Sequence, residues 1–156
     1  MSCILSLTAA AVIAGLTITS TASVALVSAL DNGEELDEIQ GLETVFVDMG
    51  ILVKTLKEEY DCHVNIISDN EIQVVTSNGN LVYRRDNVTE AFKLYFNEIK
   101  DVDKLIQNIK SFEVDYGRNV QNYTYAHIKE NLPNNMSIFE EEIMEDDSLY
   151  LTINID

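Results

Sequence analysis

Charged and apolar positions divide the chain into an uncharged opening, an acidic connection and a longer patterned part. The first thirty residues contain no charged side chain, whereas residues 31–48 contain seven acids and no base. A helix that crosses a membrane needs about 20 apolar residues, so the opening is long enough for one. We therefore expect an apolar helix over residues 1–30, followed by an acidic linker or short helix over residues 31–43.

Residues 44–156 begin with the periodicities of one helix and a group of strands. Apolar residues at helical spacing follow Asp48, which is a suitable N-cap, and they predict a helix. Apolar and polar residues then alternate over three segments, which predicts three strands with a hairpin turn at Asn78-Gly79. The segment 92–97, FKLYFN, alternates in the same way and predicts either a fourth strand or the start of a helix.

The last third of the chain returns to helical spacing and ends in two strands. Apolar residues three and four apart predict one long helix, or two consecutive helices that meet at Gly117. Pro133 marks the end, because proline cannot continue a helix. Alternation over 136–144 and 148–155 predicts two final strands. The whole order predicts an α+β fold, with one antiparallel sheet of five to six strands and helices packed on one face.

The apolar opening has three interpretations. A secretory signal could be cleaved after Val27-Ser28-Ala29, but no basic residue precedes Lys54 to supply the usual basic start. A membrane helix is the second interpretation, although nine of the thirty residues are Ser or Thr, which lower its hydrophobicity. The third is a helix buried in a protein assembly. A row of small residues at helical spacing favours close helix packing, and it consists of Thr8, Ala11, Gly15, Thr19 and Ala22.

We expect residues 4–30 to mediate membrane association or self-association, and the protein to be membrane-associated. The alternatives are a cytoplasmic protein within an assembly, or a secreted protein if residues 1–29 are cleaved.

The charge is strongly negative and lies in two segments. The net charge is −17, and residues 138–147 hold six acids without a base, as residues 31–48 hold seven. Such a charge argues against nucleic acid and anionic lipid headgroups as binding partners, because both are negatively charged and would be repelled. The two segments are either solvated surfaces or docking sites for a basic protein. The candidate partner-binding residues are Glu34, Glu35, Asp37, Glu38, Glu140, Glu142 and Glu145.

Candidate catalytic and metal-binding residues are few. Cys62 and His63 are neighbours in a predicted strand and would point to opposite faces, so they would not share a metal ion. His127 lies on the apolar side of the long helix, and it would form a dyad with Cys62 only if the fold joined them. The acidic run 140–147 lacks the glycine usual at the bend of a calcium loop. We therefore predict no enzyme activity, no metal and no cofactor.

Two stretches give residues 44–156 a resemblance to a known family. The first is TVFVDMGILVKTLKEEYDCHV, at residues 44–64, and the second is NYTYAHIKENLPNNMSIFEEEIMEDDSLYLTINI, at residues 122–155. They resemble an uncharacterised family that includes a hypothetical reading frame of red-algal plastids and cyanobacteria. The matching positions are Tyr123, Tyr125, Ile128, Lys129, Leu132, Glu142, Leu149 and Ile153.

The resemblance implies a small α+β domain without an established activity. Some relatives are encoded beside an ATPase of the AAA type, which implies that such an ATPase is a possible partner. The chain departs from the family in its apolar opening, which replaces a short polar start, and residues 69–110 match poorly.

Together these patterns predict a non-enzymatic interaction protein. A small acidic domain, anchored by the apolar N-terminal helix, would dock a partner through its acidic surfaces. The alternative is an inhibitor or immunity protein that neutralises a basic toxin or nuclease, because acidic surfaces bind such targets quickly.

Overall fold

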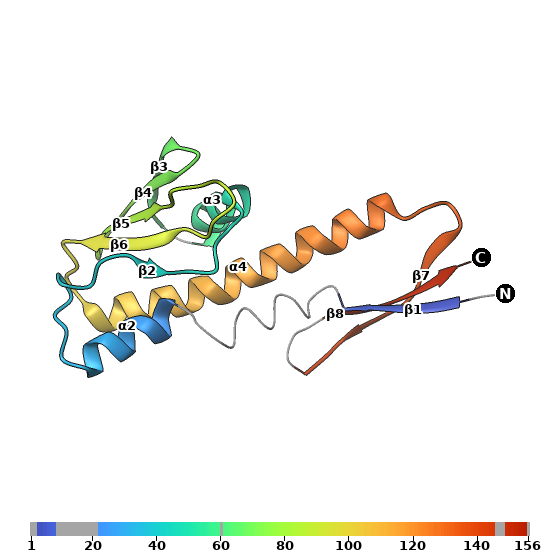
Figure 1. The fold of residues 1–156 in the computed structure, drawn as a ribbon, viewed down its shortest axis with the longest axis horizontal. Helices are drawn as coiled ribbons and strands as arrows, with labels where there is room; N and C mark the ends of the chain where they lie inside the picture. Colours follow the sequence, from blue (N-terminus) through green and yellow to red (C-terminus); the bar gives the residue numbers. More distant parts are fainter. Residues whose placement is uncertain (1–2, 9–21, 60, 146–148, 156) are drawn as a thin grey trace. The chain divides into compact units, whose positions relative to one another are not determined.

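A computed structural model describes residues 3–8, 22–59, 61–145 and 149–155, and its elements are those of an α+β protein (Figure 1). In chain order they are β1 (Cys3–Thr8), α2 (Ala22–Asp31), β2 (Leu42–Glu43), α3 (Met49–Glu59), β3 (His63–Ser68), β4 (Glu71–Thr76), β5 (Gly79–Arg84), β6 (Lys93–Asn97), α4 (Val102–Asn131), β7 (Met136–Ile143) and β8 (Leu149–Ile155). This confirms the predicted α+β class.

The chain divides into two compact units. Thr19–Tyr116 form the first, here called the meander unit, and Met1–Ile18 together with Gly117–Asp156 form the second, here called the hairpin unit. The helix α4 contributes its first half to the meander unit and its second half to the hairpin unit.

A five-stranded antiparallel sheet forms the centre of the meander unit. Its strand order is β2-β6-β5-β4-β3, so the strands β3 to β6 follow one another as a meander. Ile72 pairs with Tyr83 and Tyr83 pairs with Leu94, and all three side chains are buried on one face. The predicted meander is confirmed, and segment 92–97 supplies a strand and not a helix.

The hairpin between β4 and β5 turns one residue earlier than the sequence predicts. Thr76 pairs with Gly79, so the two loop residues are Ser77 and Asn78. Gly79 is the first residue of β5 and has a positive φ of 138°. A Cβ at this position would lie 2.7 Å from Cδ1 of Ile99, so a close approach as well as the turn requires glycine here.

Helices cover the apolar face of this sheet, and Phe46 joins them to it. Its ring centroid lies 5.1 Å from that of Phe112 and 4.7 Å from that of Tyr116, both on α4, and 6.0 Å from that of Tyr83 on β5. On α3, Leu52 is fully buried. The predicted N-cap of α3 is confirmed, because Oδ1 of Asp48 accepts a hydrogen bond of 2.9 Å from the Ile51 amide.

The final two strands do not belong to the five-stranded sheet, which corrects the prediction of one sheet. They form a separate three-stranded sheet in the order β1-β8-β7. The six residues of β1 pair with β8, from Cys3 opposite Ile155 to Thr8 opposite Tyr150. One edge of the larger sheet is formed by β2, a strand of two residues that is too short to show alternation.

Helix α4 is continuous from Val102 to Asn131, so the two-helix alternative is wrong. Gly117 lies buried within it. The helix ends before Pro133, whose carbonyl accepts a hydrogen bond from the Met136 amide in the turn to β7.

The apolar opening is described only at its two ends. Cys3–Thr8 form a strand, and Ala22–Asp31 form a helix whose Ala22, Ser23 and Leu26 are buried. Residues 3–8 therefore differ from the predicted helix, whereas residues 9–21 lie outside the described residues, and a helix there stays a prediction. Among the helices of the described residues, none has the length and apolarity that crossing a membrane requires.

Candidate functional site

The most exposed large apolar side chains of the described residues lie on β7. Ile143 is 73% exposed and Phe139 is 69% exposed. Phe139 stands at a bulge, because the pairing with β8 shifts between Ile138 and Glu140. A bulge leaves its extra residue without a pairing partner and re-aims the side chain. The bulge therefore presents an aromatic ring to solvent.

Three of the predicted partner-binding acids surround these apolar side chains in sequence. Glu140 and Glu142 lie within β7 and Glu145 follows it, and all three are exposed. Within the described residues none of these three carboxylates forms an ion pair. We call Phe139, Glu140, Glu142 and Glu145 the β7 surface, whereas Ile143 lies two residues after Glu141 and shares its face of the strand.

The cross-strand register adds a second aromatic side chain next to this surface. Glu142 pairs with Tyr150 on β8, and Tyr150 is 39% exposed. Glu141, in contrast, is held within the unit, because its carboxylate accepts a hydrogen bond from the hydroxyl of Tyr125 on α4. Alternation along the strand thus separates a carboxylate bonded to the helix from carboxylates that face solvent.

The other four predicted acids lie in the connection between α2 and β2, in the meander unit. Glu34, Glu35, Asp37 and Glu38 are all exposed. The carboxylate of Glu38 accepts a hydrogen bond of 3.1 Å from the Glu35 amide, which holds the segment as a turn. The connection is therefore a linker with turns, without a helix of its own.

The predicted row of small residues is only partly described. Thr8 ends a strand, and Ala22 begins α2 and is fully buried. Ala11, Gly15 and Thr19 lie outside the described residues, so the helical row itself stays a prediction.

Cys62 and the two histidines occupy different kinds of position. His63 is exposed on β3, and Cys62, directly before it, is half-buried. His127 is exposed on α4, in the hairpin unit, where its ring stacks on Tyr123 with centroids 6.3 Å apart. Among the described residues, no group of three His, Cys, Asp or Glu side chains is placed to hold a metal ion.

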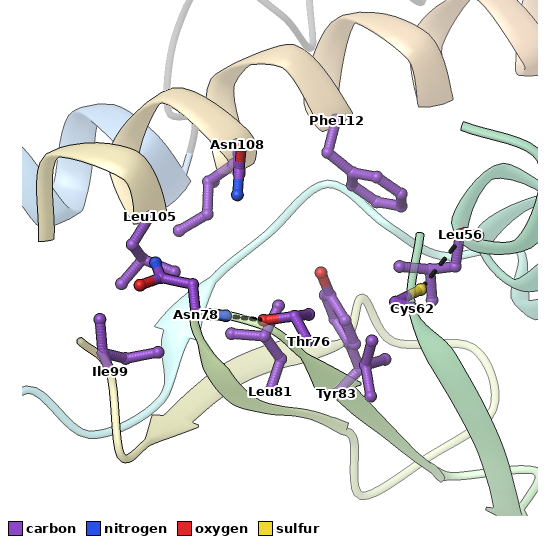
Figure 2. Close-up of a pocket in the computed structure, with 12 residues that line it drawn as sticks. Leu56, Cys62, Thr76, Asn78, Leu81, Tyr83, Ile99, Leu105, Asn108 and Phe112 are labelled. Carbon is purple, nitrogen blue, oxygen red and sulfur yellow. Dashed lines mark hydrogen bonds between the residues drawn. The ribbon is translucent and has the colours of Figure 1, made fainter. Parts of the chain in front are cut away.

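A small cavity lies inside the meander unit, between the sheet and the first half of α4 (Figure 2). Its volume is about 50 Å³. Strands β4 and β5 supply one wall, with Val74, Leu81 and Tyr83, and α4 supplies the opposite wall. Figure 2 shows the hydroxyl of Tyr83 and the amide of Asn108 pointing toward the space between them. Sequence patterns gave no indication of this cavity, because it depends on how α3, β4, β5 and α4 meet.

Cys62 contributes its thiol to the wall of this cavity. Its Sγ donates a hydrogen bond of 3.4 Å to the carbonyl of Leu56 (Figure 2). Burial, and then the charge of Asp61, raise the pKa of the Cys62 thiol above its ordinary value. A thiol with a raised pKa is mostly protonated at neutral pH and is a poor nucleophile. Cys62 therefore acts here as a small apolar group.

Two buried charged side chains were not singled out by sequence patterns. Arg85 donates hydrogen bonds to the carbonyls of Val47, Asp69 and Glu90, at 2.7–3.3 Å. Glu113 accepts from the Ala22 amide at 2.5 Å and from the Ser23 hydroxyl at 2.7 Å.

Both side chains hold the fold together. The guanidinium of Arg85 joins three connections of the meander unit, and Glu113 caps the N-terminus of α2. Charged residues of this kind are common on protein surfaces, so nothing in the local sequence indicates that these two are buried.

Comparison of the chain with protein-family models, curated proteins and solved structures gives no significant match. The resemblance to the uncharacterised family, and the ATPase partner that it implies, stay predictions.

Proposed function

We propose that this chain is a non-enzymatic interaction protein that docks a basic protein partner through the β7 surface. One observation carries the proposal: Phe139, the most exposed aromatic side chain of the described residues, stands at a bulge next to the exposed carboxylates of Glu140 and Glu142. Solvated acidic surfaces need no such apolar side chains, and apolar side chains in contact with water favour burial in an interface.

The composition of the β7 surface suits a docking site. Protein interfaces derive most of their binding energy from a few central aromatic and apolar anchors. Charged groups around the anchors accelerate encounter with an oppositely charged partner and select against partners of like charge. Phe139 would be the anchor, with Tyr150 beside it, and Glu140, Glu142 and Glu145 would select a basic partner.

The acidic linker and the N-terminal segment have supporting roles in this proposal. The linker, with Glu34, Glu35, Asp37 and Glu38, would add long-range attraction for the same basic partner. Residues 4–30 would hold the protein at a membrane or in an assembly. Cleavage after Ala29 would remove β1 and the buried side chains of α2, so the proposal keeps residues 1–30 in the working protein.

A defined basic probe tests the β7 surface directly. The full-length chain, labelled with ¹⁵N, would be titrated with a peptide of alternating lysine and leucine at about 0.05 M and about 0.5 M salt. We expect saturable chemical-shift changes at the backbone amides of β7, with a much lower binding affinity at the higher salt. Chemical-shift changes confined to the acidic linker, or a binding affinity that does not depend on salt, would contradict the proposed surface.

A charge-reversed variant supplies the matched comparison. Glu140→Lys with Glu142→Lys should weaken binding of the peptide about tenfold or more, because two attractive charges become repulsive. Asp86→Lys with Glu90→Lys changes the net charge equally at exposed acids of the meander unit, and it should weaken binding much less.

The anchoring role has its own test, and it should leave the folded part intact. Deleting residues 1–30 would also remove β1 and leave β8 with an open edge, which itself promotes aggregation. Substituting Ala11→Glu and Gly15→Glu avoids this. These changes should move the protein from the membrane or particulate fraction to the soluble fraction. An unchanged distribution between the fractions would contradict the anchoring role.

A further inference from the structure

The cavity of the meander unit is lined by uncharged side chains and is partly open to solvent. Its apolar lining includes Leu81, Tyr83, Leu105, Ile109 and Phe112. Leu81 is half-buried and the other four are buried, so the cavity reaches from the surface into the core of the unit. A charged ligand would lose its hydration here without gaining a counter-charge, which excludes anions and cations.

Several polar atoms in the wall are already engaged within the protein. The side chain of Asn78 donates to the Asp101 carbonyl and accepts from the Asp101 amide, each at 2.8 Å. The hydroxyl of Thr76 donates to the Gly79 carbonyl at 2.8 Å and accepts from the Asn78 amide. A water molecule is stable in a cavity when it finds two to four polar partners. The side chains of Thr76 and Asn78 offer little to it, and the Tyr83 hydroxyl and the Asn108 amide are the polar groups that point toward the space (Figure 2). Because apolar side chains supply most of the lining, the cavity favours an apolar occupant.

The size of the cavity limits that occupant. A single water molecule needs about 10–15 Å³ measured in this way, so about 50 Å³ holds roughly four groups of water or methylene size. Side chains that line such a space lack contacts only on the side that faces it, so an occupant adds dispersion attraction there.

We infer that this cavity is a binding site for a small uncharged apolar ligand, in the form of an alkyl chain or chain end of about four carbon atoms. The ligand lies between strands β4 and β5 and helix α4, with the Cys62 thiol at one end of the site (Figure 2). This inference does not depend on the β7 surface, which belongs to the other unit.

The position of Cys62 allows a direct chemical test. The chain has two cysteines, so a Cys3→Ser background leaves Cys62 as its only thiol. With propyl methanethiosulfonate, the Cys62 thiolate forms a disulfide bond to the propylthio group, methanesulfinate leaves, and the proton passes to the buffer. The aminoethyl reagent attaches a group of nearly equal length that ends in an ammonium charge.

The two adducts should change the melting temperature in opposite directions. The propyl adduct fills the cavity and should raise Tm by roughly 2–5 °C. The aminoethyl adduct buries a charge and should lower Tm. A propyl adduct that lowers Tm as much as the aminoethyl adduct would overturn the inference.

Xenon tests the same site in the unmodified full-length chain, because dry apolar cavities take up this gas. Under increasing xenon pressure, the methyl signals of Leu81 and Leu105 should shift and then saturate. Leu151 is fully buried but lies in the hairpin unit, and its methyl signals should not saturate in this way. No saturable shift at Leu81 and Leu105, or an equal response at Leu151, would contradict the inference.

Discussion

Two adjacent arginines illustrate how differently the same residue type acts in this protein. Arg84 is exposed and pairs with the Glu71 carboxylate at 3.0 Å. Arg85 is buried, and its guanidinium lies 4.1 Å from the centre of the Phe92 ring while it bonds to backbone carbonyls of three connections. An exposed ion pair contributes little to stability. A buried guanidinium that donates to several carbonyls is hard to replace, because no other side chain has its planar set of donors.

Lysine substitutions at these two positions should therefore have unequal effects. Arg85→Lys keeps the charge but removes the planar guanidinium and several of its hydrogen bonds. It should lower the free energy of unfolding by about 2–4 kcal/mol. Arg84→Lys should cost less than about 1 kcal/mol. Urea denaturation followed by circular dichroism measures both, and equal losses would show that Arg85 does not organise the three connections.

The Cys62 thiol predicts a dependence of stability on alkaline pH. Burial raises its pKa above the ordinary value of 9.0, so the folded protein holds the proton more tightly than the unfolded chain does. The associated stabilisation is complete below pH 9.0 and is lost as pH rises through the raised pKa. Burial also raises the pKa of Tyr116 above 10.0, which adds a loss at higher pH.

Comparison of two proteins isolates the contribution of the thiol. Between about pH 8 and about pH 10.5, the Cys3→Ser protein should lose more stability than the same protein with Cys62→Ala. Tyr116 contributes to both and cancels in the difference. Parallel pH profiles would mean that the Cys62 thiol has the same pKa in the folded and unfolded states.

At the scale of elements, local patterns were informative where an element is long enough to repeat. The alternation in β4 and β5 and the helical spacing in α4 predicted their types, because each buries one face. The two residues of β2 are too few to alternate, and the bulge at Phe139 interrupts the pattern that would have indicated its exposure.

The β4–β5 hairpin gives a prediction at this scale. Gly79→Ala would place a Cβ 2.8 Å from the Glu98 carbonyl oxygen, at a φ of 138° that other residues rarely adopt. We expect a loss of about 3 kcal/mol in the free energy of unfolding. Gly33→Ala is the control, because Gly33 also has a positive φ, of 87°, but nothing lies within 4 Å of the added Cβ. It should cost about 1 kcal/mol, and equal costs would rule out the close approach at Gly79.

At the scale of the whole molecule, sequence patterns could not reveal which strands share a sheet. One partner of β8 is β1, at the opposite end of the chain, and pairing over such a distance leaves no local signal. The candidate site was predictable only in part, because the sequence shows local patterns and not contacts between distant segments. The acids Glu140, Glu142 and Glu145 are visible as a charge run, whereas the cavity beside Cys62 exists only after the helices meet the sheet.

The central claim is that the β7 surface docks a basic protein, and site-specific photocrosslinking in the native cell tests it most directly. A benzophenone amino acid would replace Phe139 in one version of the full-length chain and Val88, which is 53% exposed in the meander unit, in another. We predict that position 139 gives an adduct with one basic protein, and that Glu140→Lys with Glu142→Lys abolishes it. The same adduct from position 88, or an adduct that survives the charge reversal, would contradict the account.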